Sequence, residues 1–294
     1  MIRLARSRIL FHGLIGGCLA ICASAGLAST QVLYNSALAP DFSYTPSTPG
    51  WLSGVFFGMT ETVTPQGTQL VPNVPDDYAG RGGYSSHSIF GTKVNPAFPS
   101  LDRNTGFSLS LGFRVLAESH TGNTNNTGNV NRAGFSIILI GSDLKGIELG
   151  FQGPDQSNGF PAGRIFAQND GTAGLFTAGE NQTDPAAVGA VFDYNRWDLN
   201  IKGNGYALTR AGAPVLSGAL RDYSSFSGLG QTAYRTPSYL FFGDNTGSAL
   251  ALFSIDYAAV AVVSEPSRYA MMFSGLVLVG AIALRRRGGG YRAG

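Results

Sequence analysis

The stretch Phe107-Ser108-Leu109-Ser110-Leu111-Gly112-Phe113-Arg114-Val115 alternates apolar residues with small or polar ones. Successive side chains of a β-strand point to opposite faces, so this alternation predicts a strand with one buried face. Further short runs of this kind follow at 135–140, 146–151, 164–168, 174–177, 197–201, 206–210, 215–220, 239–242 and 250–263. Such short, closely spaced strands with no helical period between them favour an all-β sandwich or barrel.

Turn-forming residues separate these runs. Gly203-Asn204-Gly205 lies between two alternating runs, and Asn-Gly is a preferred pair for a tight hairpin because both turn positions must accept a positive φ. Residues 120–132 are rich in Gly and Asn and predict a long exposed loop. Residues 35–100 are rich in Pro, Gly, Ser and Thr, with weak strand signals at 51–57, and favour irregular edge structure.

The order of the later runs has a counterpart in a known family. It consists of the strand 107–115, the tryptophan strand 197–201, the glycine hairpin to 206–208, a small turn at Gly212, then 215–218, 241–244 and a final long strand. This order resembles the laminin-G-like, concanavalin-A-like jelly roll. The resemblance covers just over half of the chain and implies two packed sheets with Trp197 in the core between them.

Composition limits the class of protein. The chain has 294 residues, 44% of them hydrophobic and only 13% charged, which is too apolar for a disordered protein. Between residues 26 and 264 there are 12 Lys and Arg against 17 Asp and Glu, a net charge of 12 − 17 = −5. A negative body argues against nucleic acid as a partner.

The N-terminus has the three parts of a secretory signal. Arg3, Arg6 and Arg8 precede an apolar run at 9–23, and small residues follow at 23–28. We expect export and cleavage by signal peptidase near Ala28. Two alternatives stay open, an uncleaved membrane helix and a lipoprotein signal ending at Cys18.

Both cysteines, Cys18 and Cys22, lie inside this signal. The cleaved protein therefore has no thiol for a disulfide, a thiolate metal site or nucleophilic catalysis.

The C-terminus carries a second targeting pattern. Ser264-Glu265-Pro266-Ser267 is followed by an uncharged run at 269–284 and by Arg285-Arg286-Arg287. The arginines place the C-terminus in the cytoplasm by the positive-inside rule, with the body outside the membrane. The apolar run is short for a stable spanning helix, which suits a processed signal.

This three-part tail resembles the PEP-CTERM sorting domain. The resemblance implies recognition by an exosortase-type transpeptidase, in Gram-negative bacteria that make extracellular polysaccharide, with Glu265, Pro266, Ser267, Arg285, Arg286 and Arg287 as the sorting motif. The family usually has Pro-Glu-Pro, and Ser264 replaces its first proline. A plain tail anchor is the alternative, and it would leave the topology unchanged. The expected layout is a signal at 1–28, an irregular part with edge strands at 29–105, the sandwich at 106–263 and the sorting anchor at 264–294.

Catalytic motifs are scarce in the exported body. Its two histidines, His87 and His120, stand beside Ser and Gly and are expected in solvated loops, and no Gly-x-Ser-x-Gly elbow is present. Asp143 and Glu148 come nearest to a glycosidase carboxylate pair, but Gly146 between them favours a solvated turn. We therefore expect no enzymatic activity, with a polysaccharide hydrolase as the alternative.

Calcium is the metal that the sequence favours, because laminin-G-like jelly rolls often bind it through loop oxygens. The predicted ligands are Asp143, Asp193, Asp244 and Asn245, with Asp155 and Asp170 as further loop carboxylates. Turn capping explains each of them equally well, since all stand near Gly or Asn.

Carbohydrate is the ligand class that fits such a body. A sugar site needs an aromatic platform, and Trp51, Tyr84, Tyr223 and Tyr234 are the candidates. The sequence thus predicts an exported cell-surface or matrix protein with a non-catalytic binding or structural role. Extracellular polysaccharide is the candidate partner, and the C-terminal helix provides the membrane contact.

Overall fold

A computed structural model describes residues 28–38, 43–73, 80–119, 133–153, 164–168, 193–227, 230–246 and 249–263. The expected signal and sorting segments, the loop at 120–132 and the strand at 174–177 lie outside this part of the chain. No helix among the described residues is long and apolar enough to cross a membrane.

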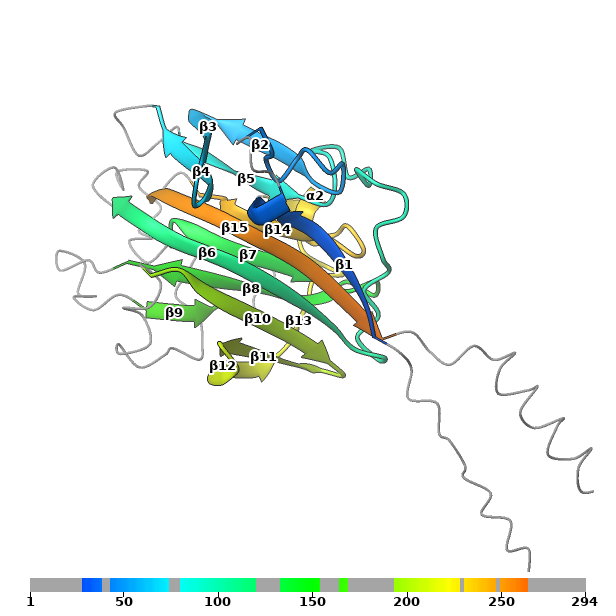
Figure 1. The fold of residues 1–294 in the computed structure, drawn as a ribbon. Coiled ribbons are helices and arrows are strands. Elements are labelled where there is room, and N and C mark those ends of the chain that lie inside the picture. Colours follow the sequence, from blue (N-terminus) through cyan, green and yellow to red (C-terminus); the bar gives the residue numbers. More distant parts are fainter. Residues whose placement is uncertain are drawn as a thin grey trace, which may run out of the picture.

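The described chain folds into two antiparallel β-sheets packed face to face (Figure 1). The eight-stranded sheet has the order β12-β11-β10-β6-β15-β4-β3, and β1 also pairs with β15. Its strands are β1 (Ala28–Asn35), β3 (Met59–Thr64), β4 (Gly67–Pro72), β6 (Phe107–Ser119), β10 (Asn195–Lys202), β11 (Gly205–Arg210), β12 (Ala213–Ala219) and β15 (Leu250–Val263).

The seven-stranded sheet has the order β13-β8-β7-β14-β5-β2, and β9 also pairs with β8. Its strands are β2 (Ser53–Phe57), β5 (Arg81–Ser85), β7 (Phe135–Ile140), β8 (Lys145–Gln152), β9 (Arg164–Ala167), β13 (Arg221–Asp222) and β14 (Leu240–Asp244). Helix in the described residues is confined to the 3-10 turn η1 (Ser36–Leu38) and the short α2 (Gln231–Tyr234). The predicted all-β sandwich is confirmed.

Between the sheets lies one apolar core. The alternating residues Phe107 to Val115 of β6 are all buried on this side, as predicted, and so is Trp197 of β10. Phe113 stacks on Phe135 of the opposite sheet with ring centroids 4.1 Å apart. Side chains alternate between the two faces along the strands of both sheets, and those that point inward fill the interior with aromatic rings.

The N-terminal part is more regular than the sequence indicated. Residues 28–105 supply β1 to β5, and β1 and β4 pair with successive halves of β15. Leu33 and Tyr34 of β1 are buried in the shared core. The sandwich therefore already includes Ala28.

The hairpin between β10 and β11 differs from the prediction by one residue. Lys202 pairs with Gly205, so the two turn residues are Gly203 and Asn204. Gly203 has a φ of 60° and Asn204 has no positive φ, which is the backbone pattern of a type II′ turn rather than of an Asn-Gly type I′ turn. Type I′ and type II′ turns both match the right-handed twist of the flanking strands. The sequence Gly203-Asn204-Gly205 alone therefore does not distinguish the two turn types.

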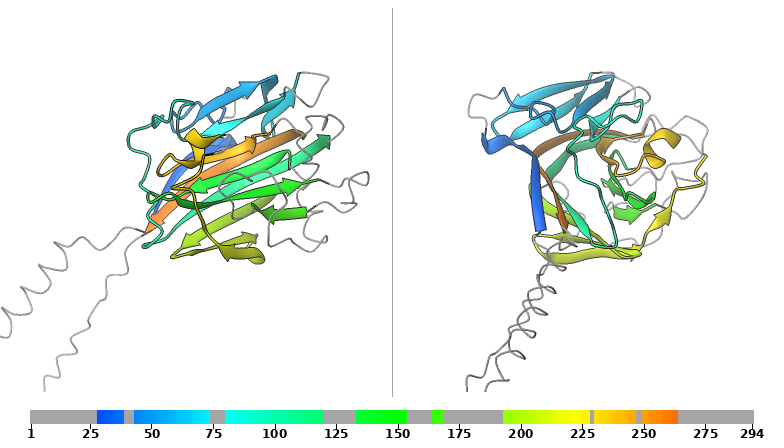
Figure 2. Two further views of the ribbon diagram at one scale, coloured as in Figure 1. Left: turned by 180° about the vertical axis from the view of Figure 1, so that it is seen from behind. Right: turned by 90° about the vertical axis from the view of Figure 1, so that its right-hand side faces the viewer.

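The outer face of the seven-stranded sheet carries a second apolar cluster. The chain from β13 to β14 crosses this face and brings α2 over it (Figure 2). The cluster consists of Ile138, Ile140, Tyr223, Phe226, Tyr234, Tyr239 and Phe241. This covered outer face is where the candidate site lies.

Candidate functional site

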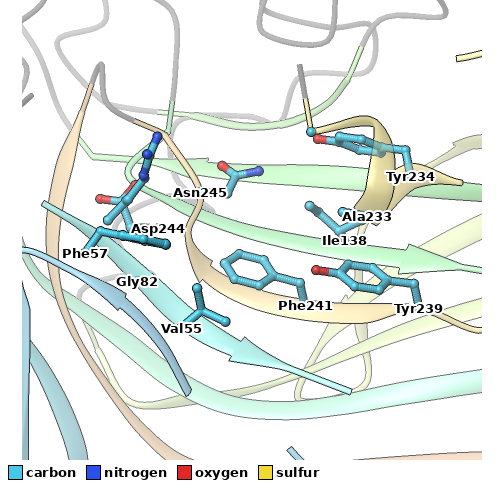
Figure 3. A pocket seen from close by; sticks show the side chains of 12 residues that line it. Val55, Phe57, Gly82, Ile138, Ala233, Tyr234, Tyr239, Phe241, Asp244 and Asn245 are labelled. Carbon is cyan, nitrogen blue, oxygen red and sulfur yellow. The ribbon is translucent and has the colours of Figure 1, made fainter. Parts of the chain in front are cut away.

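A pocket of about 310 Å³ opens on the outer face of the seven-stranded sheet, between its β2 edge and α2, and is called the outer pocket below. Its apolar lining comes from Val55, Phe57, Ile138, Ala233, Tyr239 and Phe241, and its polar lining from Arg81, Tyr234, Asp244 and Asn245. In Figure 3 Asp244 and Phe57 lie at one end of the pocket and Tyr234 at the other. Phe241 and Ile138 lie between these ends.

Glycines in adjacent strands leave room for Phe241, which lines this pocket. Gly83 of β5 pairs with Gly243 of β14 on one side and with Val55 of β2 on the other. A Cβ at Gly83 would lie 2.8 Å from a ring atom of Phe241 and closer still to the Phe242 carbonyl. Because such contacts are not tolerated, only glycine leaves room for Phe241 to lie across the sheet here.

Glu148 of β8 organises the end of the outer pocket near α2. Its carboxylate accepts hydrogen bonds from Tyr234 Oη (2.5 Å), Gln168 Nε2 (2.6 Å) and Asn245 Nδ2 (2.7 Å). Three donors around one buried carboxylate favour its ionised form, since an ionised carboxylate only accepts. Glu148 thereby fixes two residues of the pocket lining, Tyr234 and Asn245, relative to the sheet.

Asp244 organises the opposite end. Its carboxylate accepts the backbone N–H groups of Thr246 and Ala251 and so ties together the two ends of the β14–β15 connection. Burial raises the pKa of the Asp244 carboxyl well above its usual range, and these backbone hydrogen bonds oppose the rise. Both of its oxygens are thus engaged in holding the loop.

Arg81 and Phe57 form the open rim. They are cross-strand partners on β5 and β2, and the guanidinium of Arg81 lies over the Phe57 ring at 5.1 Å from its centroid. Phe57 is 48% exposed. The rim therefore offers an aromatic face and a cation to a ligand, which is a combination suited to polar ring-shaped molecules.

The four residues predicted as calcium ligands are placed in different regions. Asp244 and Asn245 adjoin the outer pocket, whereas Asp143 lies in the turn at the far end of β7 and forms an ion pair with Arg103 (2.6 Å). Asp193 precedes β10, in the other sheet. Within the described ranges no three His, Cys, Asp or Glu residues are grouped closely enough to hold a metal ion. Asp155 and Asp170 lie outside these ranges, and calcium binding stays a prediction.

The prediction that Glu148 lies in a solvated turn is wrong. Asp143 does lie in a partly exposed turn, but Glu148 lies in β8 and is only 6% exposed. Gly146 pairs with Ile140 inside the hairpin, so the turn ends before it. The glycine was taken for the turn itself, and this is why the sequence missed Glu148 as an organising residue.

His87 is buried, so the prediction that it lies in a solvated loop is wrong. Its Nδ1 lies 2.9 Å from Ser86 Oγ, and desolvation, reinforced by the charge of Lys93, lowers its pKa to about 4. Ser86 Oγ is fully buried and also binds the backbone N–H of Leu240. The pair is therefore a structural contact between β5 and β14 rather than an accessible nucleophile with its base. His120 lies outside the described residues.

The aromatic residues predicted as a sugar platform are not exposed as such a platform requires. Tyr84, Tyr223 and Tyr234 are buried, so none of them is an exposed platform, and Trp51 is half-buried against the main core. The exposed ring at the outer pocket is Phe57, which the sequence analysis did not single out. Strand alternation places it on the outer face beside Arg81, and that pairing could not be read from the sequence.

Comparisons with known proteins give no family for this chain. No protein-family model matches the sequence, and no curated protein matches it. Among solved structures, a carbohydrate esterase from a Shiga toxin-encoding bacteriophage is similar, with 13% identity, a TM-score of 0.44 and coverage of 80% of this chain and 100% of that one.

Two further solved structures have similar values. A lectin from Bauhinia forficata in complex with GalNAc has 12% identity and a TM-score of 0.43, covering 81% of this chain and 100% of that one. A protein of unknown function with a galectin-like fold from Bacillus subtilis has 12% identity and a TM-score of 0.42, with the same coverage.

Proposed function

We propose that this protein is an exported surface protein whose β-sandwich binds carbohydrate without cleaving it. The observation that carries the proposal is the outer pocket, where the exposed Phe57 ring stands beside Arg81 and Asn245. Sugar rings present C–H faces that pack on aromatic rings and hydroxyl groups that pair with amides and charged side chains. A pocket with both kinds of group fits this ligand class.

The carboxyl groups at the site support binding rather than hydrolysis. Glycoside hydrolysis uses two carboxyl groups on either side of the bond, one of them able to reach the leaving oxygen. Glu148 is buried under three side-chain donors, and both oxygens of Asp244 accept backbone N–H groups. Each carboxylate is thus engaged in building the pocket. A polysaccharide hydrolase remains the alternative function.

The ends of the chain support export and surface attachment. The basic and apolar N-terminus suits signal peptidase, and the tail from Glu265 to Arg287 suits an exosortase-type enzyme in the inner membrane. We include in the proposal a concanavalin-A-like jelly-roll topology, which the order of strands from Phe107 to Val263 supports. Extracellular polysaccharide is the proposed partner outside the cell.

Binding to immobilised polysaccharides tests the proposal. The full chain, kept in mild detergent because of its apolar ends, is applied to a panel of polysaccharides with and without calcium, and retention and released sugar are both recorded. We expect retention without release. Phe57→Ala should weaken binding about tenfold through lost stacking area. Phe90→Ala is the matched control, because Phe90 is also exposed (83%) but does not line the outer pocket.

The outcomes separate the candidate functions. Released sugar would make the protein a hydrolase. No retention on any polysaccharide, or equal losses for Phe57→Ala and Phe90→Ala, would remove the outer pocket as a carbohydrate site.

A further inference from the structure

From the rim of the outer pocket we infer that the saccharide it takes is acidic, with a sugar carboxylate, as in a uronic acid, paired to Arg81. This inference rests on the proposed function and adds the chemical class of the sugar. The position of Arg81, the hydrogen bonds that already occupy Asp244 and the orientation of Asn245 support it.

Arg81 is a cation that the described part of the protein leaves without an ion pair. It is exposed at the start of β5, and its guanidinium rests on Phe57 without a hydrogen bond or salt bridge to any described residue. Packing on an aromatic ring orients the guanidinium plane but uses none of its five N–H donors. The donors therefore stay available for a ligand at the rim.

The neighbouring acid does not neutralise this cation by direct pairing. Asp244 is the carboxyl group in the described lining, and its two oxygens accept the N–H groups of Thr246 and Ala251. It is also 1% exposed, so a ligand meets the charge of Arg81 first. A planar carboxylate matches the guanidinium fork with two parallel hydrogen bonds.

Asn245 supplies the complementary acceptor. Its Nδ2 must face Glu148, because an ionised carboxylate can only accept a hydrogen bond. Its Oδ1 is then directed away from Glu148, and no described donor occupies it. Asp244 pairs with Gly82, which places Asn245 one step further along, level with Arg81. A carboxylate on Arg81 and a hydroxyl group on Asn245 are two substituents that one uronic acid ring carries.

The size of the outer pocket agrees with a short segment of such a polymer. At about 310 Å³ it is at the small end of the range for ligand pockets. It therefore fits a single or terminal acidic sugar better than a long stretch of polysaccharide. Phe57 provides the stacking face beside this sugar.

A matched pair of ligands tests the inference. The full chain in mild detergent is titrated calorimetrically with oligogalacturonate of defined length and with the same oligosaccharide after its carboxyl groups have been reduced to alcohols. We expect the acidic form to bind at least about tenfold more tightly, as one charge-assisted hydrogen-bonded pair predicts.

Variants at Arg81 locate the effect. Arg81→Gln should lose about tenfold to a hundredfold of the affinity for the acidic ligand and little for the reduced one, and Arg81→Lys should retain part of it. Arg210→Gln on β11 of the other sheet is the control and should bind as the unchanged protein does. The melting temperature of each variant shows whether it folds.

Each outcome has one meaning. Equal binding of the acidic and reduced ligands overturns the inference and leaves carbohydrate binding standing, and so does an equal loss of both in Arg81→Gln. Binding of neither ligand, nor of any polysaccharide in the wider panel, removes the proposed function together with the inference.

Discussion

Glu148 shows how a buried carboxylate can shape the outer pocket without being part of its lining. Three side chains from three different segments donate to it, so removing the charge leaves donors facing a group that no longer accepts them all. We expect Glu148→Gln to lower the free energy of unfolding by about 2–4 kcal/mol, the range for breaking a buried charged network. Urea denaturation followed by fluorescence measures this loss.

The matched control for Glu148 is Asp143→Asn. Asp143 pairs with the cation Arg103, but it lies in a partly exposed turn, where an ion pair contributes about 1 kcal/mol or less. Similar losses in the two variants would contradict the role given to Glu148. Weaker saccharide binding in Glu148→Gln, with the fold retained at low temperature, would support the placement of Asn245 by this residue.

His87 provides a pH dependence that can be attributed to a single residue. Its pKa is lowered from 6.5 to about 4 in the folded protein, so the unfolded chain binds the proton more readily. Stability is therefore fully present above pH 6.5 and falls as the pH drops from about 6.5 towards 4, by on the order of 3 kcal/mol. We expect His87→Gln to lack this component, which the difference between the two unfolding free energies at each pH measures. Parallel pH profiles for the two proteins would contradict the assignment.

At the scale of elements, the hairpin between β10 and β11 offers a direct comparison of two turns. Gly203 has a positive φ and open space around it, whereas Gly205 has no positive φ and a Cβ there would make only ordinary contacts. Gly203→Ala should cost about 1 kcal/mol through backbone strain alone, and Gly205→Ala should be near neutral. Thermal unfolding of the two variants decides between the turns, since an Asn204-Gly205 turn would reverse the order.

The strands were predictable because their signal is local. The alternation from Phe107 to Val115 and the apolar run from Leu250 to Val263 depend only on which residues face the core, and both strands lie where expected. The site was not predictable in the same way. Phe57, Arg81 and Asn245 are far apart in the sequence and meet only because β5 lies between β2 and β14. Register and sheet order are long-range properties, so no local pattern reveals that juxtaposition.

At the scale of the whole molecule, the two ends of the described body meet. Ala28 and Val263 are cross-strand partners on β1 and β15, at one corner of the sandwich (Figure 1). The expected signal peptidase site directly follows Ala28, and Glu265-Pro266 follows Val263. Cleavage at both places would therefore remove only the exposed Ala28 from the end of β1, so a processed protein should keep the stability of its core.

If the protein is exported and sorted as proposed, its mature form should lack both terminal segments. Intact-mass spectrometry of the protein released from the native cell surface should give a chain that begins near Ala28 and ends near Ser264. A double variant with Glu265→Ala and Pro266→Ala should keep its tail, because the processing enzyme would no longer recognise the motif. A wild-type protein that keeps its tail, with an unchanged body outside the cell, would contradict sorting and indicate a plain membrane anchor, since the arginines at 285–287 would give the same topology without any cleavage.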